Sequence, residues 1–196
     1  AIVAPFGLLV LLLAANSPRG IVGAAIFGSS LITLFSTSAI YHLVPLGRRL
    51  RVLVRRLDHS SIFVFIAATY TPFALMLMSN GWGIPLLSVV AGLAGAGAVV
   101  SLAGPVASRR IRVMLYLTLG WIGIVAISEL WSALPGRAIV LLLLSGILFS
   151  LGAAIYATRR PDPFPCVFGY HESFHALEVA ATVVVYSVVL IYVLPS

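Results

Sequence analysis

Long apolar runs dominate the chain, and short polar connections separate them. A helix needs about 20 apolar residues to cross the roughly 30 Å hydrocarbon core of a bilayer. Seven runs meet or approach this length: 2–16, 20–45, 58–79, 84–104, 112–131, 137–158 and 171–194. None alternates apolar and polar positions as a membrane β-strand does. Because lipid offers no partners to exposed backbone groups, each run predicts a transmembrane helix.

The connections between these runs have the composition of turns, as at Asn16–Gly20, Asn80–Gly83 and Pro161–Pro165. Because all are short, consecutive helices are expected to run antiparallel. The small-residue stretch from Ala91 to Gly97 predicts close packing of the fourth helix against a neighbour. No linker or change of composition divides the chain. The pattern therefore predicts an all-α fold, a single seven-transmembrane helix bundle over residues 1–196.

Composition agrees with a lipid environment. Hydrophobic residues make up 61% of the chain, charged residues only 9%, and the mean hydropathy is +1.15. Soluble domains carry about 25% charged residues. The net charge is +7, and all of the basic residues that contribute to it are Arg, because the sequence contains no Lys. No basic face remains once the apolar runs are placed in a bilayer, which excludes nucleic-acid binding. The absence of Lys also excludes a retinal Schiff base.

The Arg residues also predict the orientation in the membrane, because basic residues collect in cytoplasmic loops. Only Arg19 and Arg137 lie on one side. Ten lie in the alternate connections: Arg48, Arg49, Arg51, Arg55, Arg56, Arg109, Arg110, Arg112, Arg159 and Arg160. The N-terminus is therefore expected in the cytoplasm and the C-terminus outside it, in a multi-pass protein of the cell membrane, specifically a bacterial inner membrane.

Two further features bear on processing and redox chemistry. The first apolar run lacks the charged region and cleavage site of a signal peptide, so we expect a helix there. Cys166 is the only cysteine, which excludes an intramolecular disulfide. An ordinary free thiol is the simplest interpretation of that residue.

Histidines gather at the cytoplasmic side of the expected bundle. His42 lies at the end of the second helix, Asp58 and His59 open the third, and His171 and His175 open the seventh. Ionisable groups are expensive inside a membrane and are by default candidates for function. Since random placement would scatter them over both faces, their common depth predicts a site.

The spacing of the histidines indicates a metal. His171 and His175 are four residues apart, so they share one face of a helix and can bind one ion. His42 would supply a third nitrogen, which completes the pattern of a catalytic zinc with an open fourth position. Asp58 is then the candidate general base. Ser38, one turn before His42, could hydrogen-bond the attacking water or a carboxylate.

The same segment also fits the zinc-protease pattern H-E-x-x-H, in which Glu172 would be the general base. That interpretation needs a distal carboxylate ligand, and the candidate, Asp162, lies between two prolines in a loop. Glu172 suits equally well a helix N-terminus, where the dipole favours an acid. An intramembrane metalloprotease is therefore the lesser alternative.

Three other ionisable residues have less specific interpretations. His59 points about 100° away from Asp58 around its helix, which favours a structural or interfacial role. Glu178 shares the face of His175 but lies deeper in the membrane, where it could orient a histidine or line a polar cavity. Glu129 is expected near the opposite interface, exposed at the surface.

Four segments together resemble a known family: Ser38–His42, Leu57–Ser60, Ala68–Phe73 and His171–His175. They are similar to segments of the bacterial hemolysin III family, within the progestin and adiponectin receptor superfamily. The resemblance extends over essentially the whole chain. It implies seven helices and an N-terminus inside.

The resemblance also implies a ligand set and roles for the polar residues. It places zinc on His42, His171 and His175, a water held by Asp58, and Ser38 nearby. Receptor members are linked to ceramidase-type amide hydrolysis, and bacterial members to haemolysis and membrane-lipid homeostasis.

Membrane lipids are thus the expected partners, and the leading prediction is a zinc-dependent lipid amide or ester hydrolase at the cytoplasmic leaflet. The alternative is a non-catalytic membrane-homeostasis or pore-forming protein with a structural zinc. A lipid-accessible cavity that ends at the metal would favour the enzyme. A closed site with four ligands, or a continuous water path, would favour the alternative.

Overall fold

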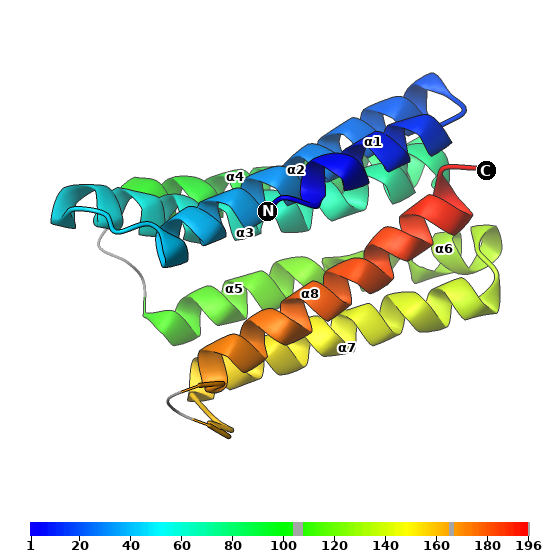
Figure 1. Ribbon diagram of the computed structural model, residues 1–196. Coiled ribbons are helices and arrows are strands. Elements are labelled where there is room, and N and C mark those ends of the chain that lie inside the picture. Colours follow the sequence, from blue (N-terminus) through cyan, green and yellow to red (C-terminus); the bar gives the residue numbers. More distant parts are fainter. Residues whose placement is uncertain (104–107, 165–166, 196) are drawn as a thin grey trace.

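The computed structural model describes residues 1–103, 108–164 and 167–195 (Figure 1). Cys166 lies outside these residues, so its assignment as a free thiol stays a prediction. Extended structure in the described part is limited to an isolated bridge between Phe164 and Phe168. The helical elements, in chain order, are α1 (Ala4–Ala14), α2 (Pro18–Leu43), α3 (Arg48–Met76), α4 (Asn80–Ala103), α5 (Arg109–Trp121), the 3₁₀ turn η1 (Ile122–Ala126), α6 (Ile127–Ala133), α7 (Gly136–Thr158), α8 (Tyr170–Val188) and the π turn η2 (Val189–Val193).

Six helical stretches among the described residues are long and apolar enough to cross a membrane. Two of them combine several elements, because α5, η1 and α6 form one stretch and α8 continues into η2. The first helix, α1, has 11 residues, fewer than the roughly 20 needed for a full crossing. The chain is therefore an all-helical, multi-pass membrane protein, and its seventh crossing stays a prediction.

The helices form two groups, α1 to α4 and α5 to α8, which lie against each other with their long axes roughly aligned (Figure 1). The closest packing joins α2 to α3, α3 to α4 and α7 to α8, whereas contact between the groups runs mainly through α3. Phe27 and Phe65 stack in the core with ring centroids 6.3 Å apart. The last residues of α2, α4 and α7 and the first residues of α3, α5 and α8 all lie at one end of the bundle. We call this the Arg-rich end, because ten of the twelve Arg residues lie at or near these helix ends.

The third helix is longer than the sequence predicted. It begins at Arg48 rather than at residue 58, after Gly47 in an extended conformation. The Arg and Leu residues that follow are good helix formers, and their charge does not interrupt a helix at a membrane surface. The expectation that Asp58 and His59 open this helix is therefore wrong, since both lie about three turns inside it.

The small-residue stretch Ala91–Gly97 packs closely at one glycine only. A Cβ at Gly97 would lie 2.5 Å from the Phe63 ring, so a side chain there would require this ring to move. Nothing lies within 4 Å of the same position at Gly92 or Gly95. Close helix packing thus holds for Gly97, while most of the stretch faces outward.

The orientation of the bundle can be tested with reporter fusions. A reporter fused after Ser196 should read as non-cytoplasmic, because the Arg-rich end is expected to face the cytoplasm. A fusion truncated after Arg160, at that end, should read as cytoplasmic and serves as the control. The reverse pair of readings would contradict the predicted topology.

Candidate metal centre

Three imidazoles meet at the Arg-rich end of the bundle. His42 comes from the last turn of α2, and His171 and His175 come from the first turns of α8. The Nε2 atom of His171 lies 3.3 Å from Nε2 of His42 and 3.2 Å from Nε2 of His175. One ring nitrogen from each residue lies within 4.8 Å of the other two. The structure therefore brings together the three residues that were predicted from the sequence to be metal ligands.

Local capping explains why α8 begins where it does. The backbone N–H of Gly169 donates to Glu172 Oε2 at 2.9 Å, and the N–H of Tyr170 donates to Asp162 Oδ1 at 2.8 Å. These carboxylates satisfy donors that a helix N-terminus leaves without partners. With the first turn fixed, His171 and His175 fall on one helix face, one above the other.

Two of the three nitrogen–nitrogen separations match the edge of a tetrahedral metal site. At zinc–nitrogen distances of 2.0–2.1 Å, two ligand atoms of a tetrahedral site lie about 3.3–3.4 Å apart. The two measured separations of 3.2 and 3.3 Å are close to this edge. A set of three imidazole nitrogens suits zinc and the neighbouring transition metals. One cation can also accept all three lone pairs, which hydrogen bonds among the rings cannot satisfy together.

A carboxylate behind one of the rings supports the same interpretation. His175 Nδ1 lies 3.1 Å from Glu178 Oε2, and only 12% of the Glu178 side chain is exposed. An Nδ1–H that donates to a carboxylate leaves the Nε2 lone pair free for a metal. Glu178 thus contacts a histidine and also lines the cavity, while its expected role in orienting the ring stays a prediction.

Ser38 and Asp58 form a second polar pair beside the histidines. The Ser38 hydroxyl lies near the Asp58 carboxyl group, across the α2–α3 interface. Asp58 is half-buried and lies within electrostatic range of Glu178 and His175. Among the described residues, the ligand atoms that converge are those of the three histidines and not that of Asp58. Asp58 thus stands beside the cluster rather than in it.

The remaining ionisable residues lie elsewhere. The carbonyl of His59 accepts the Tyr116 hydroxyl at 2.8 Å, and its ring does not join the cluster, as expected for a structural residue. The expectation that Glu129 is exposed at the surface is met only in part. Its side chain is half-buried, and its carboxylate accepts the N–H of Ser79 at 3.2 Å, just before α4 begins.

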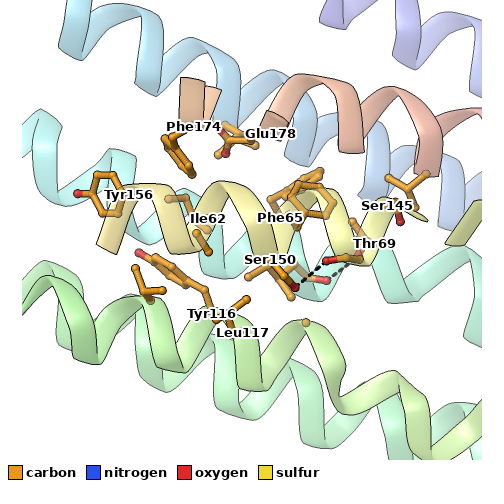
Figure 2. Close-up of a pocket in the computed structure, with 18 of the residues that line it drawn as sticks. Ile62, Phe65, Thr69, Tyr116, Leu117, Ser145, Ser150, Tyr156, Phe174 and Glu178 are labelled. Atoms are coloured by element: carbon orange, nitrogen blue, oxygen red, sulfur yellow. Dashed lines mark hydrogen bonds between the residues drawn. The ribbon is translucent and has the colours of Figure 1, made fainter. Parts of the chain in front are cut away.

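A cavity of about 1100 Å³ extends from the histidines between the two helix groups. Figure 2 shows Tyr156, Phe174 and Glu178 near one end, and Thr69 and Ser145 farther along. The cavity follows one face of α3 for about 27 Å, at 1.5 Å per residue over 18 residues. The α3 residues that line it are Arg55, Asp58, His59, Ile62, Phe65, Ile66, Thr69, Tyr70 and Phe73.

Sequence reasoning missed a break in the wall of this cavity. The Tyr70 hydroxyl lies 2.9 Å and 2.6 Å from the carbonyl oxygens of Leu119 and Gly120, and it accepts the N–H of Gly123 at 3.1 Å. At this point α5 gives way to the 3₁₀ turn η1. The two glycines were the only local signal, and they do not identify the tyrosine that inserts there.

The contact between Glu178 and His175 leads to a prediction about metal affinity. Glu178→Leu should weaken metal binding about 10- to 100-fold, because it removes the group that orients the ring. A competitive chelator titration measures the effect, and Glu129→Leu, at the other end of the bundle, is the control. Unchanged affinity in Glu178→Leu would show that this contact does not tune the site.

Comparison with known proteins adds to this geometry. Residues 1–186 match the family model described as haemolysin-III related. The chain is 32% identical over 185 residues to the hemolysin-3 homolog of Bacillus subtilis (strain 168), covering 93% of this chain and 84% of that protein. It is 30% identical over 181 residues to hemolysin-3 of Bacillus cereus, covering 92% and 80%.

Other relatives are named as receptors or heptahelical membrane proteins. The chain is 31% identical over 186 residues to the adiponectin receptor protein of Drosophila melanogaster, covering 85% of this chain and 41% of that receptor. A heptahelical transmembrane protein of rice, ADIPOR1, is 27% identical over 181 residues. The resemblance derived from the four sequence segments is therefore confirmed for both branches.

Proposed function

Because the chain belongs to the haemolysin-III related family, we propose that it is a zinc-dependent hydrolase of membrane lipids, which cleaves amide or ester bonds at the cytoplasmic leaflet. The main support for the proposal is the position of the cavity relative to the histidines. Its walls are largely apolar, and one end reaches the three histidines and Asp58. An acyl chain in such a cavity would place its carbonyl carbon at the polar end.

Each polar residue at this end of the cavity would have a separate role in the hydrolysis. His42, His171 and His175 would hold zinc, which when bound polarises a carbonyl and makes water more acidic. The Asp58 carboxylate would accept the proton of the attacking water as general base. Ser38 would orient Asp58 by its hydrogen bond. The other role expected for Ser38, a hydrogen bond to the attacking water, would require its hydroxyl to turn away from Asp58.

The apolar walls of the cavity would contribute to the reaction by excluding water. Ile62, Phe65, Leu142 and Phe149 line the cavity beyond the polar residues. They would exclude water from around the acyl chain, which strengthens electrostatic interactions at the reacting carbonyl. Since the histidines lie at the Arg-rich end, a lipid whose chain follows this cavity would keep its head group at that membrane surface.

The alternatives have less support. A structural zinc would need a closed site with four ligands, whereas the converging cluster among the described residues has three. A water-filled pore would need polar walls throughout, but Phe73, Leu130 and Ile139 line the far part of the cavity. A protease would use Glu172 as a base, yet this carboxylate caps α8.

Lipid hydrolysis by the purified full chain tests the proposal. Ceramides and acyl-ester lipids would be supplied in mixed micelles, and released fatty acid would be measured by mass spectrometry. We expect release from at least one of these lipids, loss of release after chelator treatment, and recovery when zinc is restored. The control Arg110→Gln, an exposed residue outside the cavity lining, should behave as the parent protein does. No chelator-sensitive release from any of these lipids would refute the proposal.

A further inference from the structure

Three arginines line the cavity at the same end as the histidines. Arg55 comes from α3, and Arg109 and Arg112 come from the first turn of α5. A guanidinium group near the hydrocarbon core is costly unless an opposite charge meets it. Within residues 1–103, 108–164 and 167–195, neither Arg55 nor Arg109 forms an ion pair with a carboxylate. The Nε atom of Arg55 is also buried without a hydrogen-bond partner there.

Arg109 contacts two tyrosine rings that in turn lie close to His171. Its guanidinium carbon lies 4.8 Å from the ring centroid of Tyr156 and 5.8 Å from that of Tyr170. Each of these rings lies 6.1 Å from the ring of His171. One N–H group of Arg109 donates to the Tyr156 carbonyl at 3.2 Å. Because a guanidinium carries five donors in a planar fork, others remain for a ligand.

The nearby acids have other partners. Glu172 and Asp162 cap α8, Glu178 contacts His175, and Asp58 lies beside Ser38. No carboxylate of the described residues lies within ion-pair distance of Arg55 or Arg109, so an anionic ligand would supply the opposing charge. That ligand must also reach into a largely apolar cavity, so it is an amphiphile with an anionic head group.

A phosphate group matches this site better than other anions of lipids. Its tetrahedral oxygens accept paired N–H donors from guanidinium groups, and it can bridge arginines on two helices. We propose that Arg55, Arg109 and Arg112 bind the phosphate of a lipid whose acyl chain lies in the cavity. The substrate class would then be phosphorylated acyl lipids rather than neutral ones. The proposed hydrolysis underlies the statement about substrates, whereas the binding stands without it.

Binding of two matched lipids tests this proposal. Ceramide and ceramide 1-phosphate share the same acyl amide and differ in the phosphate alone. Their affinities for the purified full chain in neutral detergent would be measured with fluorescent analogues, before and after chelator treatment. We expect the phosphorylated lipid to bind at least about tenfold more tightly, as a charge-assisted contact requires.

Variants locate the contact. Arg109→Gln and Arg55→Gln should each remove most of the preference for the phosphorylated lipid. Arg109→Lys should keep part of it, because it retains the charge and loses the fork. Arg110→Gln is the matched control, since Arg110 is exposed and outside the cavity lining, and it should keep the full preference. Thermal melting in detergent checks that each variant folds.

Three results would overturn the proposal. One is equal binding of the two ceramides. A second is an equal loss in Arg110→Gln and Arg109→Gln, which would indicate general attraction to a basic surface. The third is competition by inorganic phosphate at the same concentration as the lipid, which would assign the site to a free anion. Selective binding without hydrolysis would support this site and refute the hydrolase, whereas equally efficient hydrolysis and binding of both ceramides would do the reverse.

Discussion

Purified protein should carry about one zinc ion per chain, and replacement of both His171 and His175 by Ala should reduce it to background. The double change removes two of the three nitrogens that converge at the Arg-rich end. A single remaining imidazole cannot hold the ion against water and buffer, because affinity depends on several ligands acting together. Elemental analysis after purification without chelators measures the metal content directly.

A matched variant separates loss of ligands from loss of structure. His59 lies at a similar depth but outside the cluster, so His59→Ala should retain zinc. Thermal melting should show the double variant still folded in detergent. Stoichiometric zinc in the double variant, or no transition metal in the parent protein, would contradict the assignment of this site.

The sequence predicts part of this site on physical grounds. The spacing of His171 and His175 alone places two imidazoles on one helix face. Antiparallel helices with short connections then bring the end of α2 and the start of α8 to the same end of the bundle. Which helices become neighbours there is not determined by periodicity. The position of His42 against His171, with ring centroids 4.9 Å apart, comes from the packing of the whole chain.

The features that were mispredicted have two causes, the limits of hydropathy and contacts with distant segments. Hydropathy reports how much of a helix fits in lipid, and it does not report where the helix ends. The start of α3 at Arg48 was missed for that reason. At the break after Trp121 the Tyr70 hydroxyl contacts the Gly120 carbonyl, fifty residues away in the chain. Glu129 was taken for a surface residue because its partner, the N–H of Ser79, belongs to a distant segment.

The roles of the carboxylates lead to the prediction with the largest expected effect on activity. Asp58→Asn should keep most of the zinc and lower lipid hydrolysis about 100- to 10,000-fold, the usual contribution of a general base. An amide still forms hydrogen bonds with Ser38, but it cannot accept a proton at neutral pH. Zinc content and fatty-acid release would be measured on the same preparation.

Glu172→Gln is the matched variant, because it makes the same chemical change in a carboxylate that caps α8. Its effect should be mild, since an amide oxygen still accepts the N–H of Gly169. Strong loss of zinc in Asp58→Asn would instead make Asp58 a ligand, and the three-nitrogen site would be incomplete. If Glu172→Gln is the more damaging change, Glu172 is the base, as in the zinc proteases. The role of Asp58 as proton acceptor would then have to be abandoned.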